Sequence, residues 1–520
     1  MTLSYETKPG DVDHLIADDH AVVLRRFEQL EAGAGDRRTL VDQVIFELSA
    51  HAVGEEKVVY PVMAESGDEG LAAEARDEHR QMKESLAVLD GTEPGTPEFE
   101  QSLRDLIAEV RAHAVEEEGQ WLPRLRQAVG AVRMAQLGED FMTAKATAPS
   151  RPHPSAPDSG AATKVVGAVT GLVDKVRDKG AGRMKRLATD ASGALDPQAQ
   201  EVLDAFAALE PLPPEVLPPA IARRQPTAAD AVKAVLEQRG QSTAPEEIGV
   251  AEDRTVPGPA GAPDVAVRVY RPVGATAGDP LPVIVYVHGG WVIADLDVYD
   301  ASARAMTNKA QSIVVSVEYR HAPEDPFPAA HDDVLAATRW VLANAAELDG
   351  DPARVSIMGE SAGGNLAAST TLQLLWAGEP APVAQVLVYP VVTGSQDSPS
   401  YTDAADARPL NRPMMSWFSH WTFKDSSLSP TDPRFELLGL PDDRLAGLPP
   451  TLVITAERDP LRSQGEQFAE RLRGAGVDVE HLPVSGVTHE FFGMSAVLDA
   501  AEHAQQRAAD HLQRAASAAR

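Results

Sequence analysis

The chain has 520 residues, of which 43% are hydrophobic and 24% charged, and its formal net charge at pH 7 is −31. This length exceeds that of one ordinary domain, and the composition is that of a globular protein. The negative charge argues against nucleic acid as a partner, because a phosphate backbone favours clustered Lys and Arg. The absence of cysteine excludes disulfides, thiolate metal ligands and cysteine nucleophiles, so any metal must be held by nitrogen and oxygen atoms.

The N-terminal sequence MTLSYETKPGDVDH lacks the apolar core of a signal peptide. No stretch of the sequence reaches the length of a membrane span. These features predict a cytoplasmic protein without a transmembrane segment, and the net charge favours a neutral partner or substrate.

Residues 1–145 are predicted to form a four-helix bundle. Apolar residues recur at helical spacing in LIADDHAVVLRRFEQL, LVDQVIFELSAHAV, ARDEHRQMKESLAVL and FEQSLRDLIAEVRAHAV. The connections contain helix breakers, as in AGAGD and DGTEPGTP. Amphipathic helices joined by short links are typical of an up-and-down bundle.

One short phrase occurs twice in this section, as HAVGEE at 51–56 and as HAVEEE at 113–118. Each copy places a glutamate four residues after a histidine, which puts both side chains on one face of a helix. The first predicted helix adds His20 and the third adds His79, so every helix offers a candidate ligand. The pattern predicts a metal site, and the alternative is a set of solvated acidic helix faces.

Residues 11–130 resemble the hemerythrin-like (HHE) cation-binding family. The resemblance implies a non-haem di-iron centre whose ligands are His20, His51, Glu55, His79, His113 and Glu117. The two glutamates are expected to bridge the metals, and manganese or zinc are alternatives to iron. Oxygen-carrying hemerythrins have a second histidine one turn along the third helix, where this chain has Ala75 and Lys83. Iron or oxygen sensing, or redox chemistry, is therefore expected in preference to reversible oxygen carriage.

Residues 146–191 are predicted to connect two domains. The first part of this section is rich in Pro, Ala and Ser, which is typical of a linker. A basic amphipathic helix is predicted at 164–187. It is interpreted as a connector packed on a neighbouring domain, with weak contact to a membrane surface as the alternative. The linker also predicts that a fragment starting near Ala188 folds and acts alone.

Residues 192–520 are predicted to form an α/β domain with a mostly parallel sheet. Short β-branched runs alternate with helix-length segments, as VIVYV, SIVVSVEY, RVSIMG, AQVLVYP, TLVITAE and VEHLPV. The earlier run VAVRVYRP alternates polar and apolar residues, which predicts a partly exposed antiparallel strand at the start of the sheet.

Three side chains after successive strands predict a serine triad. Ser361 lies in a Gly-x-Ser-x-Gly turn that follows the strand RVSIMG. Asp459 follows the strand TLVITAE, and His489 follows the last strand. The order serine, aspartate, histidine is the one that α/β-hydrolases use. Upstream, VHGGW offers the backbone amides of Gly289 and Gly290 to a developing oxyanion.

The motifs HGGW, YRHAPEDPFPAAHDD, GESAGGN, ERDPLR and GVTHEFF resemble the hormone-sensitive-lipase branch of carboxylesterases, over about 195–515. The resemblance implies an α/β-hydrolase fold with a helical cap at about 193–245. It also implies a serine carboxylesterase (EC 3.1.1.-) without a cofactor of its own. Such an enzyme is expected to act on small esters with short or medium acyl chains, with the amide of Ala362 as a third oxyanion donor. The alternative function is a metal-dependent oxygen or iron sensor whose hydrolase domain is a weak or non-catalytic binding module.

Two departures from this family are visible in the sequence. The family usually has HGGGW, and one glycine is absent here, which shifts the loop that supplies the oxyanion amides. Loss of one such donor typically costs about 10²–10³ in rate. His321 in YRHAPE stands where an apolar residue is usual.

Overall fold

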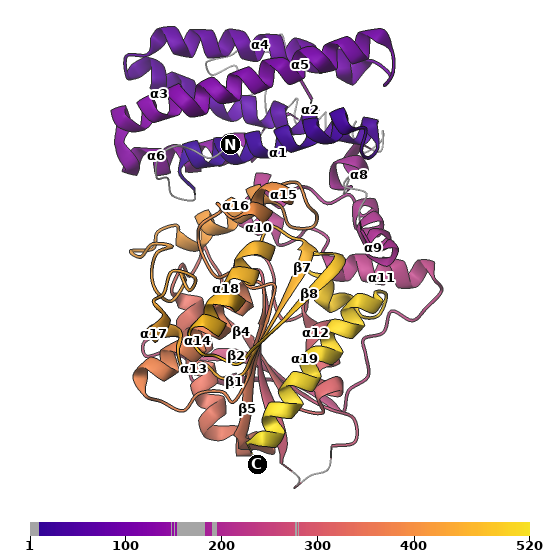
Figure 1. Ribbon diagram of the computed structural model, residues 1–520, viewed down its shortest axis with the longest axis vertical. Helices are drawn as coiled ribbons and strands as arrows, with labels where there is room; N and C mark the ends of the chain where they lie inside the picture. The colour runs from indigo at the N-terminus through magenta and orange to yellow at the C-terminus, as the bar shows by residue number, and fades with distance from the viewer. Residues whose placement is uncertain are drawn as a thin grey trace. The chain divides into compact units, whose positions relative to one another are not determined.

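The computed structural model describes residues 10–146, 148–149, 151–152, 183–189, 195–275, 278 and 280–519. The chain divides into two units (Figure 1). Unit 1 comprises residues 1–194, 206–226 and 405–417, and unit 2 comprises 195–205, 227–404 and 418–520. In the part of the chain that the structure describes, no helix has the length and apolar character needed to span a membrane. The cytoplasmic location stays a prediction from the sequence.

Unit 1 contains the predicted bundle. Its helices are α1 (Val12–Ala32), α2 (Arg37–Gly54), α3 (Tyr60–Glu65), α4 (Glu69–Gly91), α5 (Pro97–Glu116) and α6 (Leu122–Ala146). Two π-helical turns, Glu55–Val59 and Glu117–Trp121, join α2 to α3 and α5 to α6. Gly130, with φ 78°, interrupts α6 and allows the chain to turn there. The predicted helical character of the N-terminal region is therefore confirmed.

Local sequence explains where these helices begin and end. Asp36 precedes α2, and its carboxylate accepts a hydrogen bond from the amide of Thr39, 2.8 Å away. Gly33 ends α1 in the left-handed conformation, with φ 66°. The apolar faces of the helices then meet in one buried core, which includes Phe27, Leu40, Val44, Leu86, Phe99, Leu106 and Val110. Burial of these faces, more than helix propensity, stabilises the bundle.

Unit 1 also contains two segments from the C-terminal section of the sequence. Residues 206–226 include the short helix α10 (Pro219–Ala222), and 405–417 include the first half of α16 (Arg412–Phe423). Asp18 on α1 accepts hydrogen bonds from Arg412, at 2.5 Å, and from Ser416. Gln29 on α1 donates to Asp406, at 2.9 Å. The predicted basic helix at 164–187 lies outside the described residues up to 182, and 183–187 are part of α8 (Arg183–Ala188).

Unit 2 is built on one eight-stranded sheet. The strands are β1 (Val250–Val256), β2 (Val265–Arg271), β3 (Leu281–Val287), β4 (Ile313–Glu318), β5 (Gly350–Glu360), β6 (Gln385–Val388), β7 (Thr451–Arg458) and β8 (Val479–Thr488). Their order in the sheet is β1-β2-β4-β3-β5-β6-β7-β8. The pairings β1–β2 and β2–β4 are antiparallel, and every other pairing is parallel. The mostly parallel sheet is thus confirmed.

The strand β1 was not predicted from the sequence. Its residues, VAEDRTV, are largely exposed and polar, because β1 lies at the edge of the sheet. The inner strands carry the apolar runs from which they were predicted, and the last five residues of β3 are all buried. The sequence signal is therefore strong for strands covered on both faces and weak for this edge.

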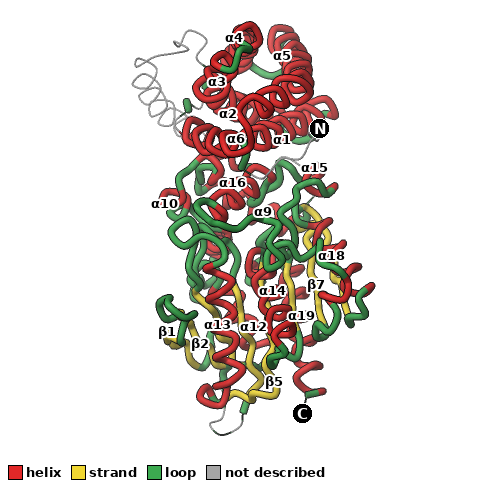
Figure 2. The backbone as a smooth tube through the Cα atoms, turned by 90° about the vertical axis from the view of Figure 1, so that its left-hand side faces the viewer, coloured by secondary structure: helices red, strands yellow, loops and turns green. Residues whose placement is uncertain are grey.

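Helices cover the sheet on both sides (Figures 1 and 2). The helices that pack on its strands are α12 (Asp300–Ala310), α13 (Ala329–Asn344), α14 (Ala362–Ala377), α18 (Arg462–Gly474) and α19 (Asp499–Ala518). The same section of the chain also forms α9 (Pro197–Ala208), α11 (Ala228–Gln238), α15 (Pro399–Asp403) and α17 (Asp442–Leu445). Helix α12 packs with α19, and α13 packs with α14. In Figure 1 these two pairs lie on opposite sides of the strands. The carboxyl ends of β5, β7 and β8 lead into Ser361, Asp459 and His489, which places the candidate triad at one edge of the sheet.

Candidate active site and candidate metal centre

Ser361 occupies a strained turn between β5 and α14. Its backbone has φ 56° and ψ −116°, which is unusual for a residue with a side chain. A Cβ atom at Gly359 would lie 2.1 Å from the carbonyl oxygen of Gly363, and one at Gly363 would lie 2.0 Å from that of Val287. Only glycine fits at either position. The Gly-x-Ser-x-Gly pattern is therefore a packing requirement of the turn that carries Ser361.

The three predicted triad residues lie in hydrogen-bond contact. The Oγ atom of Ser361 is 2.9 Å from Nε2 of His489, and Nδ1 of His489 is 2.7 Å from Oδ2 of Asp459. The other carboxylate oxygen of Asp459 accepts from the amide of Leu461, at 2.8 Å. Burial lowers the pKa of His489, but the charge of Asp459 and its hydrogen bond outweigh burial, so this pKa is raised. Such an arrangement can activate a serine hydroxyl.

The predicted oxyanion loop lies directly beside this serine. A Cβ at Gly289 would come within 3.1 Å of Cβ of Ser361, so the loop passes close to the nucleophile. The hydroxyl of Tyr319 lies 3.0 Å from the carbonyl oxygens of both His288 and Gly289. Because a trans peptide directs its N–H away from its C=O, these contacts turn the amides of Gly289 and Gly290 away from Tyr319. Tyr319 is a positioning residue that the sequence analysis did not identify.

A second buried carboxyl group lies next to the nucleophile. Glu360 accepts hydrogen bonds from the hydroxyls of Tyr286, at 2.6 Å, and Tyr389, at 2.5 Å. Burial raises the pKa of Glu360 to about 7, against the opposing effect of the two tyrosine hydrogen bonds. The sequence alone does not mark Glu360 as a special residue of the Gly-x-Ser-x-Gly motif, because Tyr286 and Tyr389 are distant from it in the chain.

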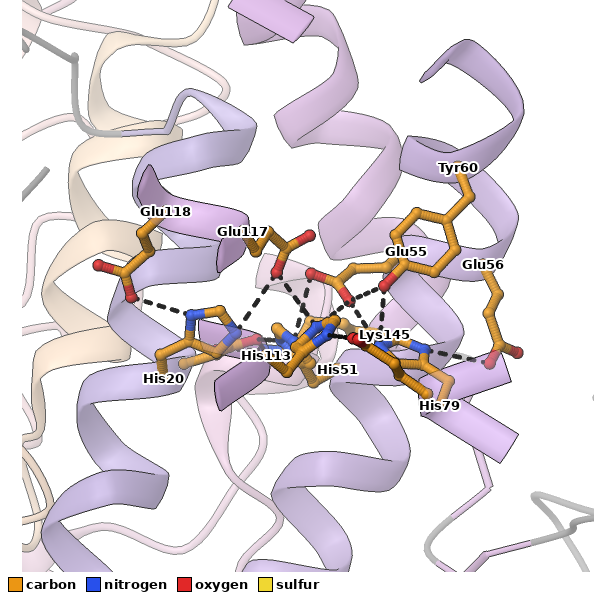
Figure 3. Close-up of polar contacts among 12 residues, drawn as sticks. His20, His51, Glu55, Glu56, Tyr60, His79, His113, Glu117, Glu118 and Lys145 are labelled. Atoms are coloured by element: carbon orange, nitrogen blue, oxygen red, sulfur yellow. Dashed lines mark hydrogen bonds and ion pairs between the residues drawn. The ribbon is translucent and has the colours of Figure 1, made fainter. Parts of the chain in front are cut away.

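The six predicted metal ligands gather inside the bundle (Figure 3). One ligand atom from each of His20, His51, Glu55, His113 and Glu117 lies within 4.8 Å of the others, and all five residues are buried. The sixth, His79, has its Nε2 atom 3.1 Å from Oε2 of Glu55.

Each of the two central carboxylates lies between two imidazoles. Glu55 is 3.2 Å from Nε2 of His51 and 3.1 Å from that of His79. Glu117 is 3.5 Å from Nε2 of His20 and 3.4 Å from that of His113. Each carboxylate could therefore contact a bound cation together with two imidazole nitrogens.

Several nitrogen and oxygen atoms of this cluster lack hydrogen-bond partners within the part of the chain that the structure describes, as expected of atoms that bind a cation. Among the described residues, the Nε2 atoms of His20, His51 and His113 and both carboxylate oxygens of Glu117 are buried without a hydrogen-bond partner. Buried polar atoms without partners are rare in folded proteins. Four imidazoles and two carboxylates, with no thiolate, suit iron, manganese or zinc.

An outer ring of carboxylates orients the four histidines. Nδ1 of His20 is 3.0 Å from Glu118, and Nδ1 of His79 is 3.2 Å from Glu56. The corresponding partners of His51 and His113 are Asp19, at 3.1 Å, and Glu78, at 2.7 Å. A proton held on Nδ1 leaves the lone pair on Nε2, which points to the centre. The second glutamate of each repeated phrase, Glu56 and Glu118, thus has a role that the sequence analysis missed.

Tyr60 is a further donor at this centre. Its hydroxyl donates to Oε2 of Glu55, at 2.9 Å, and lies 2.9 Å from Nε2 of His79. Burial, with the neighbouring charges of Glu55 and Glu117, raises the pKa of Tyr60 well above its usual range. Tyr60 follows the first π-helical turn, and each π-helical turn begins at a central glutamate, Glu55 or Glu117. Such turns are frequent at functional sites.

The fold and the site of unit 2 define a serine hydrolase of the α/β class. Residues 284–493 match the family model for the alpha/beta hydrolase fold, and residues 11–125 match that for the hemerythrin HHE cation binding domain.

Curated relatives narrow the class. The chain is 42% identical over 298 residues to carboxylesterase NlhH of Mycobacterium tuberculosis, a match that covers 56% of this chain and 91% of that protein. It is 36% identical over 239 residues to an ethyl acetate hydrolase of Pseudomonas putida, covering 45% of this chain and 74% of the relative. A solved thermostable esterase from Pseudomonas putida aligns with a TM-score of 0.55 at 29% identity, over 62% of this chain and 98% of that structure.

The chain therefore belongs to the hormone-sensitive-lipase-like carboxylesterases, and it carries a hemerythrin HHE cation-binding domain at its N-terminal end. It is a serine esterase fused to a cation-binding bundle, as the sequence motifs predicted.

Proposed function

We propose that the chain hydrolyses small esters with short or medium acyl chains, with Ser361 as nucleophile, His489 as general base and Asp459 as the group that orients it. The observation that carries this proposal is the unbroken pair of hydrogen bonds, 2.9 and 2.7 Å, that joins the three side chains. The name of the Pseudomonas putida relative, an ethyl acetate hydrolase, supports a short ester as substrate.

In the proposed reaction, Oγ of Ser361 attacks the ester carbonyl while its proton passes to Nε2 of His489. The negative charge of Asp459 stabilises the imidazolium that forms. The oxyanion accepts hydrogen bonds from the amides of Gly289, Gly290 and Ala362. His489 then returns the proton to the leaving alcohol. Water, deprotonated by the same histidine, releases the acyl group from the serine.

A chain-length panel tests this proposal. Purified protein is offered p-nitrophenyl esters from acetate to palmitate and an emulsified long-chain triglyceride. The expected result is highest kcat/KM on the shorter esters, with loss of turnover in Ser361→Ala. Turnover that survives Ser361→Ala would refute the assignment, and so would higher activity on the emulsion. Absence of turnover in both proteins would favour the alternative, a sensor whose hydrolase domain only binds.

We further propose that the bundle holds two iron ions and has a sensing or redox role. His20, His51, Glu55, His79, His113 and Glu117 would hold the ions, and Tyr60 adds an oxygen donor. Bound iron would supply reversible one-electron chemistry to the bundle. The chain's own contribution is the orientation of each imidazole by a carboxylate on Nδ1 and the exclusion of water from a buried centre.

Elemental analysis after loading with ferrous iron tests the metal proposal. Glu117→Ala should lose bound iron, because Glu117 contacts two of the four histidines. Glu116→Ala is the matched control, since Glu116 is the exposed neighbour in the same repeated phrase. Equal iron in the two variants would contradict the assignment of Glu117.

A further inference from the structure

A second group of side chains of metal-ligating types lies next to the candidate oxyanion loop of unit 2. Strands β3 and β4 are parallel neighbours, with Val287 opposite Val317. His288 follows β3 and Glu318 ends β4, so the two side chains come from adjacent strand ends. His321 follows three residues later in the chain. One ligand atom from each of the three residues lies within 4.8 Å of the others.

The tautomer of His288 directs a lone pair into this group. Nδ1 of His288 is 2.8 Å from the carbonyl oxygen of Gly289, which can only accept, so Nδ1 carries the proton. Nε2 therefore has the lone pair. This atom is buried without a hydrogen-bond partner among the described residues, and it lies 4.0 Å from Oε2 of Glu318.

Glu318 completes the contact between the two histidines. Its Oε1 atom is 3.5 Å from Nε2 of His321, and its Oε2 atom accepts from the amide of Leu296, at 3.0 Å. The side chains of Glu318 and His321 are 28% and 21% exposed, which leaves a route for an ion from solvent.

We propose that His288, Glu318 and His321 bind a divalent transition-metal ion, and that binding of this ion lowers esterase activity. The donor set favours zinc. Two imidazole nitrogens and one carboxylate oxygen are a set that zinc uses with water in the fourth position. Zinc bonds of about 2.0–2.2 Å bring ligand atoms to within about 3.5 Å of each other. Nε2 of His288 now lies 4.0 Å from Oε2 of Glu318, so an ion that joins these two atoms would draw them together by about 0.5 Å.

The inhibitory effect follows from the contacts of His288 with the candidate oxyanion loop. His288 directly precedes Gly289, and its ring stacks on Tyr319 with centroids 4.4 Å apart. The hydroxyl of Tyr319 holds the two carbonyls that orient the candidate oxyanion amides. A pull on His288 therefore moves these amides relative to Ser361. Misplacement of reacting groups by about 1 Å can cost about 10²-fold in rate, so a shift half as large should still lower turnover markedly.

The test uses the full chain, stripped of metal with a chelator and equilibrated with zinc by dialysis. The variants are His321→Leu and Glu318→Gln. The control is His503→Leu, the same substitution at an exposed histidine on α19. All four proteins have the same residues in the bundle, so zinc bound there contributes equally to each and does not affect the comparison. Wild type and His503→Leu should bind one zinc ion per chain more than the other two.

Activity gives the second readout, and only this readout rests on the esterase function proposed above. Zinc should lower kcat of the wild type and of His503→Leu by about 10-fold or more, reversibly with chelator, and should leave His321→Leu within about twofold. Equal zinc content in wild type and in both site variants would overturn the site. Equal inhibition of wild type and His321→Leu would overturn the effect on the loop. If metal-free wild type shows no esterase activity, the proposed function fails, while the zinc content still decides the site.

Discussion

Replacement of Asp459 by asparagine should separate the chemical role of this group from its structural one. Asp459 is fully buried, with one oxygen on the amide of Leu461 and the other 2.7 Å from Nδ1 of His489. Asparagine has the same shape, and its carbonyl oxygen can keep the bond to Leu461. Its NH₂ group then faces Nδ1 of His489, which must become an acceptor. The proton moves to Nε2, where it blocks acceptance of the serine proton.

The size of the effect follows from this change of tautomer. In serine triads an aspartate-to-asparagine change lowers kcat by about 10⁴-fold, which corresponds to about 5.5 kcal/mol of transition-state stabilisation. The pH profile should move as well. His489 acts as a base only when neutral, so kcat/KM of the wild type falls as the pH drops through the raised pKa of His489. The charge of Asp459 opposes burial in setting that pKa, so its removal should shift the acid limb to lower pH.

The assay is stopped-flow or steady-state hydrolysis of p-nitrophenyl butyrate from about pH 5 to 9, the range that spans a histidine titration. Asp478→Asn, the same change at an exposed aspartate, is the control and should match the wild type. Circular dichroism verifies that both variants are folded. A decrease in kcat below about 10-fold together with an unmoved acid limb would refute the role assigned to Asp459.

Three further predictions concern individual contacts. Tyr319→Phe removes the hydroxyl that holds two loop carbonyls, and it should lower kcat by about 10–10² with little change in KM, measured by steady-state kinetics. Glu118→Gln alters the group on Nδ1 of one histidine and should weaken metal binding by about 10–100-fold, measured by competition with a chelator. Gly363→Ala places a Cβ 2.0 Å from a backbone carbonyl of β3, and it should lower the free energy of unfolding of unit 2 by about 3 kcal/mol, the upper end of the usual cost of overpacking, in urea titration.

The sequence was informative where chain order dictates position. In a parallel sheet, the residues that follow successive strands meet at one edge, so Ser361, Asp459 and His489 could be grouped without any coordinates. The same reasoning placed His51 with Glu55, because positions i and i+4 share a helix face. Both inferences use only local geometry, which a short stretch of sequence determines by itself.

Partners that depend on tertiary packing were out of reach. Glu56 and Glu118 follow the central glutamates by one residue, which on a regular helix points them about 100° away. Each lies within a π-helical turn, and each reaches a histidine on another helix: Glu56 contacts His79 and Glu118 contacts His20. No periodicity in the sequence marks such a turn. Tyr319 was missed for a similar reason, since the targets of its hydroxyl belong to another strand end.

Three consecutive residues of α1 lie between the buried His/Glu cluster of unit 1 and residues 405–417. His20 is a candidate metal ligand, and the carboxylate of Asp19 is in hydrogen-bond contact with Nδ1 of His51. Asp18 accepts hydrogen bonds from Arg412 and Ser416. Successive residues on a helix point about 100° apart, so α1 presents one face to the His/Glu cluster and another to this segment.

The segment itself belongs to the chain between β6 and β7, and it continues directly from α15 of unit 2. There the hydroxyl of Ser400 donates to the carbonyl oxygen of Pro460, at 2.5 Å, next to Asp459. The connection between the two units thus includes more than the predicted linker, because the chain also crosses between them on both sides of 405–417. Asp18 and Arg412 are both buried, and breaking a buried ion pair by loss of one partner costs about 3–5 kcal/mol. A hydrolase fragment that lacks α1 would leave Arg412 without this carboxylate, which is a physical reason for one chain to carry both domains.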